Sequence, residues 1–408
     1  MRPLALYLPQ FHSFKENDGW WGKGYTEWTA VRGAKPLFDG HLQPRVPYDG
    51  EYYDLSDETG ERLKIQAEQA KKYGICGFVF YQYYFTGHKL MERPMEILLA
   101  HPEVDIKYCV CWANETWRRA WYDYNEEILL EQTYGGETEW KEHFDYLLKF
   151  FKDERYIKIG DKPMLCVYRP FEIAELRSMR DCFDRWAREA GYGGIYLVGG
   201  KSGPGEDTRN ICDAHYYFEP GYSLKHGLTG YQTFEYNMST VFNRMGNVIR
   251  RTIAGGYHTD NTESLKKGHG SPDTIRNSGS GNIAGTESAQ EPSYINQSIM
   301  SDRLEHRVPI DWVYDAILRH EYKDNEYPGI IARWDNTPRR GSKGLVYTGA
   351  SAEKFKEVLC KLKQKIPEES FVFINAWNEW GEGAMLEPDK EEGYAYLEAV
   401  REVCSDNV

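Results

Sequence analysis

Two glutamates near the C-terminus, Glu379 and Glu382, stand three residues apart in the segment Asn-Ala-Trp-Asn-Glu-Trp-Gly-Glu-Gly-Ala. Cleavage of a glycosidic bond requires such a pair, because one carboxyl group donates a proton to the departing oxygen while the other stays ionised. Three residues apart on a continuing strand, the two side chains would point to opposite faces. If the chain turns after Trp377, as the neighbouring glycines permit, both lie on one side. The alternative is that the glutamates only complement the dipole of a following helix.

Further acids, amides and aromatic residues follow other apolar runs of the sequence. The segment Trp112-Ala-Asn-Glu-Thr-Trp and the segment Trp334-Asp-Asn are the clearest examples. The 12 Trp and 31 Tyr also exceed what a core alone needs, and aromatic rings outside the core are platforms for sugar rings. We expect the following residues to bind a sugar substrate: Tyr7, Trp21, Tyr25, Glu27, Trp28, Tyr81, Trp112, Asn114, Glu115, Trp117, Tyr168, Trp334, Asp335, Asn336, Trp377 and Asn378.

Glu115 offers a second arrangement of the same chemistry. An Asn-Glu pair at the end of a barrel strand can supply an acid/base, in which case Glu379 would be a direct nucleophile. Other chemistries have weaker support in the sequence. No His-Glu-x-x-His pattern, Walker loop or Gly-x-Ser-x-Gly elbow is present, so we expect neither a metal nor an organic cofactor.

Eight short apolar runs would carry these residues. Each has the continuous apolar character of a parallel strand that is buried on both faces. The runs are Leu4–Tyr7, Gly77–Tyr81, Lys107–Trp112, Pro163–Tyr168, Gly194–Val198, Ile211–Tyr216, Gly329–Ala332 and Phe371–Ala376. Amphipathic segments alternate with them and predict helices over Asp57–Tyr73, Glu137–Phe151, Phe171–Ala190, Ile310–Tyr322, Ala352–Ile366 and Glu391–Val403. The alternation predicts an α/β fold, a single (β/α)₈ TIM barrel with its site at the carboxyl ends of the strands. A doubly wound open sheet is the alternative.

One stretch departs from the alternation. Residues 255–297 are rich in Gly, Ser, Asn and Thr and contain few large apolar side chains. Such a composition buries too little surface to offset the entropy of ordering. We therefore interpret it as a surface excursion between the sixth and seventh strands of one domain over residues 1–408. A lid over the site is a hypothesis for its role.

Composition limits the partners. Hydrophobic residues make up 41 % of the 408, which excludes wholesale disorder. The net charge of −13 argues against nucleic acid or an anionic membrane as the main partner. No apolar run is long enough for a membrane span, and the N-terminus does not have the pattern of a signal peptide. The eight scattered cysteines are expected to be free thiols, so we expect a cytoplasmic protein.

The motifs also resemble a known family. The segments Tyr7-Leu-Pro-Gln-Phe-His, Trp20-Trp-Gly-Lys-Gly-Tyr-Thr-Glu-Trp and Pro36-Leu-Phe-Asp-Gly-His-Leu-Gln-Pro are similar to those of WbsX-type proteins. The segments at Trp112, Trp334 and Trp377 are similar as well. That family is found in bacterial surface-polysaccharide gene clusters and is related to family-99 glycoside hydrolases. The resemblance covers nearly the whole chain outside residues 255–297.

The resemblance implies a barrel and assigns roles to the two glutamates. Family-99 enzymes cleave α-mannosides with retention, using two glutamates of a Trp-Asn-Glu-Trp-His-Glu segment. By position, Glu379 would deprotonate the 2-hydroxyl of the sugar, and Glu382 would be the acid/base. This chain departs from the motif at Gly381, where the hydrolases have histidine.

The function that we predict is a retaining glycoside hydrolase acting on an α-linked microbial surface polysaccharide or its precursor. Two alternatives stay open. One is a glycosyltransferase of polysaccharide biosynthesis, for which the pair Arg339-Arg340 is the weak candidate for a diphosphate site. The other is a sugar-binding protein without catalysis.

Overall fold

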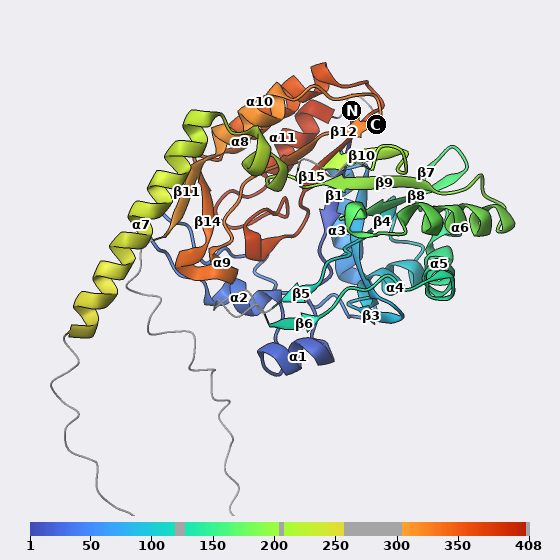
Figure 1. The fold of residues 1–408 in the computed structure, drawn as a ribbon, viewed down its shortest axis with the longest axis horizontal. Coiled ribbons are helices and arrows are strands. Elements are labelled where there is room, and N and C mark those ends of the chain that lie inside the picture. Colours follow the sequence, from blue (N-terminus) through green and yellow to red (C-terminus); the bar gives the residue numbers. More distant parts are fainter. Residues whose placement is uncertain (119–126, 204–207, 257–303, 405–408) are drawn as a thin grey trace, which may run out of the picture.

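The computed structural model describes residues 1–118, 127–203, 208–256 and 304–404. Its centre is a nearly closed barrel of parallel strands surrounded by helices (Figure 1), as the alternation predicts. The strands are β1 (Arg2–Tyr7), β2 (Gly77–Phe85), β4 (Tyr108–Trp112), β8 (Lys162–Val167), β9 (Tyr196–Lys201), β10 (Ala214–Tyr217), β12 (Glu326–Tyr327), β13 (Gly329–Ile331) and β15 (Phe371–Asn375).

Two of these nine strands, β12 and β13, together fill one strand position of the barrel. β12 and β13 are separated only by Pro328, which has no N–H to give to a sheet. β12 pairs with β10 and β13 pairs with β15, both in parallel, while the carbonyl of Pro328 accepts the N–H of Phe373 at 2.9 Å. The order β12-β10-β9-β8-β4-β2-β1-β15-β13 therefore returns to its own start. The chain forms a (β/α)₈ barrel, and the open-sheet alternative is wrong.

The strands form where the sequence is apolar on both faces. Every residue of β4 and β15 is buried, as is all of β1 except Arg2. The differences from prediction are at strand ends. β9 lies two to three residues later than its apolar run, and β10 begins only at Ala214, because Ile211 and Cys212 lie in a turn before it.

The outer helices agree with the amphipathic segments, with ends moved by a few residues. They are α3 (Glu61–Lys72), α5 (Glu137–Phe151), α6 (Leu176–Glu189), α8 (Ile310–Arg319), α10 (Ala352–Lys365) and α11 (Ala395–Cys404). α4 (Arg93–Ala100) is an addition that the sequence patterns did not single out. α3 stops before Gly74, whose positive φ of 83° ends the helix as glycine does at a C-terminus. Within the described ranges, none of the helices has the length and apolarity needed to traverse a bilayer.

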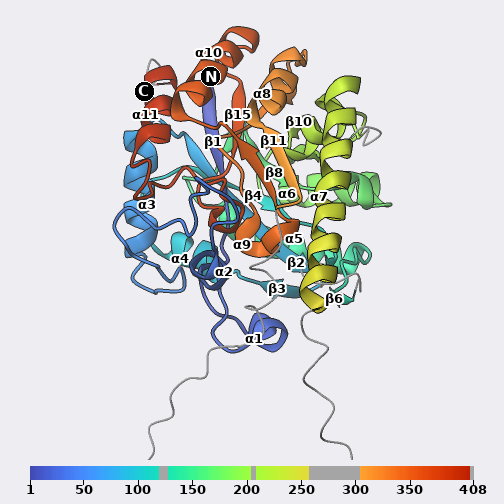
Figure 2. The ribbon, with the colours of Figure 1, turned by 90° about the vertical axis from the view of Figure 1, so that its left-hand side faces the viewer.

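Smaller elements gather at the carboxyl ends of the barrel strands, in the lower part of Figure 1. These are α1 (Lys15–Trp21), α2 (Glu27–Gly33), α9 (Thr337–Arg340), β3 (His88–Leu90), and the antiparallel pair β5 (Trp117–Arg118) and β6 (Ile128–Leu130). On the outside of the barrel lie β7 (Lys158–Ile159) and the parallel pair β11 (His306–Pro309) and β14 (Leu345–Thr348). The long helix α7 (Gly230–Gly256) runs beside β11 along one edge, as Figure 2 shows.

Two expectations about particular segments can be compared with the structure. The first two residues of the predicted excursion, 255–256, are the end of α7, and the rest of it and its role as a lid lie outside the described residues. All eight cysteines are free, and six of them are buried.

Candidate active site

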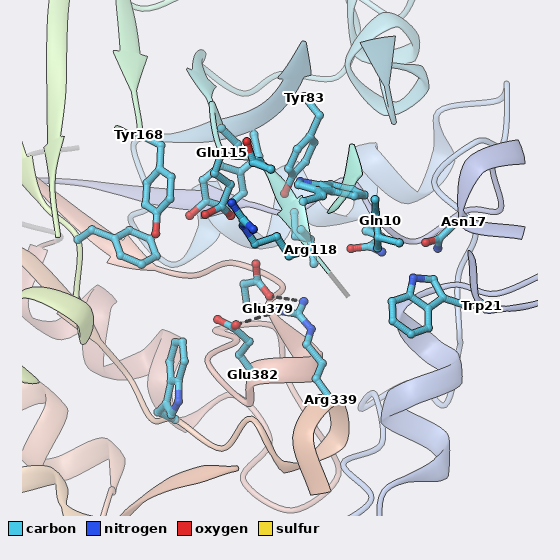
Figure 3. Close-up of a pocket in the computed structure, with 18 residues that line it drawn as sticks. Gln10, Asn17, Trp21, Tyr83, Glu115, Arg118, Tyr168, Arg339, Glu379 and Glu382 are labelled. Atoms are coloured by element: carbon cyan, nitrogen blue, oxygen red, sulfur yellow. Dashed lines mark hydrogen bonds and ion pairs between the residues drawn. The ribbon is translucent and has the colours of Figure 1, made fainter. Parts of the chain in front are cut away.

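A pocket of about 320 Å³ opens where the barrel strands end. Figure 3 shows its side chains pointing inward from several strands and from α1 and α9. Its walls are formed by Leu8, Gln10, Asn17, Trp21, Tyr81, Tyr83, Ala113, Glu115, Thr116, Trp117, Arg118, Leu129, Tyr168, Phe218, Trp334, Arg339, Glu379 and Glu382. The strand ends therefore meet at one site, as the barrel rule requires.

One guanidinium holds the two glutamates of the C-terminal motif. Arg339 donates from Nη2 to Oε2 of Glu379 at 2.8 Å and from Nη1 to Oε1 of Glu382 at 2.9 Å (Figure 3). A third carboxylate, that of Glu27, accepts from Nη2 at 2.7 Å and from Nε at 2.8 Å. Three carboxyl groups thus share one positive charge, in a place where the side chain of Glu27 is only 1 % exposed and that of Arg339 12 %.

The turn after β15 places both glutamates on the same side. The N–H of Trp377 donates to the carbonyl of Leu6, and the side-chain amide of Asn378 bonds to both the N–H and the carbonyl of Leu8. The chain then enters the short helix η4 (Trp380–Glu382), where Trp380 is buried and donates from Nε1 to Glu387 at 2.7 Å. The loop is therefore fixed to β1, and a single helical turn brings the two carboxylates to one pocket.

Burial sets the protonation of this pair. It raises the pKa of Glu379 to about 8 against the opposing charge of Arg339, and the nearby carboxylates of Glu382 and Glu27 add to the rise. Burial likewise raises the pKa of Glu382, again opposed by Arg339. One cation cannot balance three buried anions, so the pair retains a proton near neutral pH.

Gly381 is enclosed by the same cluster. A Cβ on this residue would lie 1.7 Å from Oε1 of Glu27 and 2.7 Å from Nε of Arg339. No side chain fits there without moving both partners. In this chain, the Glu27–Arg339 ion pair therefore occupies the space beside Gly381, the position at which the family-99 motif has histidine.

A second acid–arginine cluster lies on the opposite wall, where Figure 3 shows Glu115. Arg169, which follows β8, contacts Glu115 at 2.9 Å and Glu172 at 2.9 Å. Asn114 positions this arginine, since its side chain bonds to both the N–H and the carbonyl of Arg169 at 2.8 Å. Partial burial raises the pKa of Glu115, and Arg169 opposes the rise. All three charged side chains of this cluster are about one-third exposed, so water shares their solvation.

The pocket includes some of the residues predicted to bind sugar and adds others. Trp21, Tyr81, Glu115, Trp117, Tyr168 and Trp334 line it with the two glutamates. The additions of most chemical interest are Gln10, Asn17, Tyr83, Arg118, Phe218 and Arg339. The aromatic ring of Trp117 packs edge-on against Tyr83 and Phe85, which fixes one wall. Aromatic walls with a few amides are typical of sugar sites.

The other predicted residues lie behind the pocket and support it. Those in the core are Tyr7, Trp28, Trp112 and Trp377, each at most 5 % exposed. Those that fix loops are Asn114, Asn336 and Asn378, whose amides bond to backbone groups. Tyr25 packs on Trp21, and Glu27 reaches the site through Arg339.

Asp335 faces a second, smaller hollow of about 260 Å³ on the other side of Trp334. Its Oδ2 receives bonds at 2.7 Å from His41 and from Gln43. Burial alone would raise the pKa of Asp335, but the hydrogen bonds from His41, Thr337 and Gln43, with the charge of His41, bring it below its usual value. Among the described residues there is no cluster of three or more His, Cys, Asp or Glu side chains that could hold a metal ion.

Sequence reasoning missed these residues for different reasons. Arg339 was considered only as a weak phosphate ligand, yet its guanidinium is shared by three carboxylates. Gln10 lies within the motif that begins at Tyr7, and Tyr83 follows the apolar run Gly77–Tyr81, so their nearness to strand ends was the available signal. Phe218 follows β10 and carried no motif at all.

Comparisons with known proteins concern the family and the fold. The family described as Glycosyltransferase WbsX matches residues 3–400. Two proteins named uncharacterized protein WxcX, from two strains of Xanthomonas campestris pv. campestris, are each 33 % identical over 405 residues. The match covers 98 % of this chain and 49 % of each relative, so the chain spans about half the length of these relatives.

Solved structures share the fold at low sequence identity. The GH99 endo-alpha-mannosidase from Bacteroides thetaiotaomicron is 11 % identical, with a TM-score of 0.52 over 99 % of this chain and 97 % of that one. A glycoside hydrolase-like protein is 13 % identical, with a TM-score of 0.52 over 98 % and 93 % of the two chains. At this level of identity, the similarities show that the fold is shared.

Proposed function

The chain belongs to the WbsX glycosyltransferase family, and from that premise we propose that it cleaves or transfers α-linked glycosides with Glu379 and Glu382 as the catalytic pair. The substrate class we propose is a microbial surface polysaccharide or its oligosaccharide precursor. One observation carries the proposal. The carboxyl groups of Glu379 and Glu382 both bond to the guanidinium of Arg339, in an aromatic-lined pocket at the carboxyl ends of the strands.

The proposed reaction proceeds in two steps. Glu382 gives its proton to the glycosidic oxygen as the bond from that oxygen to the anomeric carbon breaks. Glu379 takes the proton of the 2-hydroxyl, and the 2-oxygen bonds to the anomeric carbon. Water or an acceptor hydroxyl then attacks that carbon and loses its proton to Glu382, while the bond from the 2-oxygen to the anomeric carbon breaks and Glu379 returns its proton to the 2-oxygen. Two inversions at one carbon give net retention.

The exposure of the two side chains supports this division of roles. Burial raises the pKa of Glu379 as well, so the pair shares a proton near neutral pH, and Glu379 acts as a base in the molecules in which that proton is on Glu382. An acid must keep its proton until the bond breaks, and the pKa of Glu382 is also raised. The side chain of Glu382 is 23 % exposed and that of Glu379 is 8 % exposed, so Glu382 is the more accessible to a leaving group.

The free thiols support the compartment that we include in the proposal. All eight cysteines lack disulfide partners, which is typical of a reducing environment. We therefore place the reaction in the cytoplasm, where polysaccharide precursors would be the substrate.

The test is hydrolysis of a panel of nitrophenyl α-glycosides and bacterial surface oligosaccharides by the wild type, Glu382→Ala and Glu189→Ala. Glu189 is an exposed acid at the end of α6 that does not line the pocket, and it controls for the loss of a glutamate. Turnover by the wild type and by Glu189→Ala, lost in Glu382→Ala, is the expected result. Oligosaccharide binding by the wild type without any turnover would contradict hydrolysis.

Transfer from a nucleotide sugar is the second candidate, favoured by the description of the family. Release of nucleoside diphosphate from GDP-, UDP- or dTDP-sugars in the presence of an oligosaccharide would support it. Arg339 is a poor candidate for a diphosphate ligand, because three carboxylates already surround its guanidinium. Binding of sugars without hydrolysis or transfer would leave a sugar-binding protein as the remaining function.

A further inference from the structure

Helix α7 presents a continuous apolar stripe to solvent. Of the ten large apolar side chains that are well exposed in the described part of the chain, six lie on this helix. Their exposed fractions range from 38 % to 73 %, and the six are Tyr231, Phe234, Met238, Val241, Phe242 and Met245. Steps of three and four residues place them on one face of the helix.

The face that packs against the barrel is the polar one. Tyr236 and Thr240 contact Nδ1 of His306 at 3.3 Å and 3.1 Å. Further along, Asn243 donates to the carbonyl of Glu305 at 3.0 Å, and Nε of Arg244 donates to its carboxylate at 3.0 Å. A helix on the surface of a monomer normally buries its apolar face and exposes its polar one, so the amphipathicity of α7 is the reverse of the usual arrangement.

We propose that the exposed stripe of α7 pairs with the same stripe of a second copy of this chain. Six side chains of this size and exposure offer roughly 700 Å² of mostly apolar surface, close to the about 800 Å² per partner of a standard interface. That is also more than the largest apolar patch of a typical monomer. The area therefore approaches what one partner contributes to a stable dimer.

Shape and charge favour a second copy over a membrane. α7 has 27 residues, which is about 40 Å of helix, and Figures 1 and 2 both show its outer side facing away from the other described elements. A straight stripe on the edge of a molecule can meet its own copy about a two-fold axis. The net charge of −13 opposes approach to an anionic lipid surface.

Sedimentation velocity across the micromolar range tests the proposal on the full chain. The wild type is expected to sediment as a dimer. Phe234→Glu/Phe242→Glu places two charges in the stripe and is expected to raise the dissociation constant at least about 100-fold. Tyr48→Glu, at an exposed aromatic residue outside α7, is the matched control and is expected to dimerise like the wild type. Circular dichroism melting checks that each variant is folded, and Met245→Lys is a milder second variant.

Three results would overturn the proposal. The first is a wild type that stays monomeric throughout the range. The second is a dimer that Phe234→Glu/Phe242→Glu and Met245→Lys leave intact. The third is a monomer that floats with vesicles of phosphatidylcholine and phosphatidylglycerol and loses this binding in the double variant, which would assign the stripe to lipid. None of these results depends on the proposed catalytic function.

Discussion

Two clusters of acids around an arginine contribute glutamates to opposite walls of the same pocket, and they differ in burial. On one wall Arg339 is bonded to Glu27, Glu379 and Glu382, with side chains that are mostly buried. On the other wall Arg169 is bonded to Glu115 and Glu172, with about one-third of each side chain exposed. The residue types are the same, so the solvent decides what each cluster can do.

Burial changes the balance of charge in the first cluster. Water stabilises surplus charge at the Arg169 cluster, and screening there keeps the interactions weak. In the Arg339 cluster, three carboxyl groups face one guanidinium with little water, and protonation is the available way to remove the surplus. The more deeply buried cluster is therefore the better placed to hold a proton for a leaving group at neutral pH. We propose on this basis that Glu379 and Glu382 carry the chemistry and that Glu115 contacts the substrate.

The largest effect is expected from removing the base of the buried cluster. Glu379→Gln keeps the shape of the side chain but cannot accept the proton of the 2-hydroxyl, so turnover should fall by about 10³-fold. The measurement is kcat on the best nitrophenyl α-glycoside of the panel. A loss below tenfold, with the variant folded as judged by its melting temperature, would remove Glu379 from the mechanism.

Arg339→Met tests the charge balance of the same cluster. Because Arg339 lowers the pKa values of Glu379 and Glu382, its loss raises both further, and the alkaline limit of activity should move to higher pH while kcat falls about 100-fold. Both pKa values already exceed those of an unfolded chain. The free energy of unfolding therefore declines as pH rises through the pKa values of the folded protein. In Arg339→Met, where these pKa values are higher, the decline should continue to higher pH.

Thermal melts at several pH values measure this effect. We expect Arg339→Met to lose about 3–5 kcal/mol at pH 8 and clearly less at pH 4.5, where Glu379 and Glu382 carry protons in the folded state and no longer need the arginine. Arg340→Met is the matched control, since its side chain is exposed. A loss in Arg339→Met that does not vary with pH would show that the arginine only fills space.

Gly381→Ala probes the packing of Glu27 behind the pair. The added Cβ would overlap Oε1 of Glu27, so Glu27 and Arg339 must shift, at a cost of about 1–3 kcal/mol in unfolding free energy and roughly tenfold in kcat. Gly33→Ala, where a Cβ meets nothing within 4 Å, serves as the control and should be nearly neutral. Wild-type stability and kcat in Gly381→Ala would mean that the cluster tolerates rearrangement.

The smallest effect is expected at the exposed cluster. Glu115→Gln removes one charge that water already shares, so kcat/KM should fall less than about tenfold, chiefly through KM. Steady-state kinetics on the same glycoside separate the two constants. If Glu115→Gln cost more kcat than Glu382→Gln, the roles of the two walls would be exchanged and Glu115 would be the acid/base.

Much of the fold could be predicted from the sequence because barrel strands are buried on both faces. The apolar run Phe371–Ala376 became β15 with one residue fewer, and Gly329–Ala332 marked the seventh strand even though Pro328 divides it. The predicted site was less complete. Periodicity does not show which aromatic residues face inward, so Trp377 and Trp112 were assigned to the pocket although they are in the core.

Contacts between distant segments explain the other differences. The bonds of Arg339 to Glu27 and Glu379 span 312 and 40 residues of sequence, and no local motif records such pairs. The same holds for α7. The sequence analysis predicted no helix there, and only the packed structure shows that the polar side of α7 faces the barrel.

The leaving-group dependence of Glu382→Gln tests most directly whether the buried cluster supplies the acid. Turnover of a phenyl α-glycoside and of a dinitrophenyl α-glycoside of the same sugar would be compared, with and without azide. We predict a loss of about 10³-fold with phenol, which needs a proton to leave, and a loss below about tenfold with dinitrophenol when azide replaces the base-assisted water. An equal loss with both leaving groups and no rescue by azide would contradict the assignment of Glu382 as the acid/base.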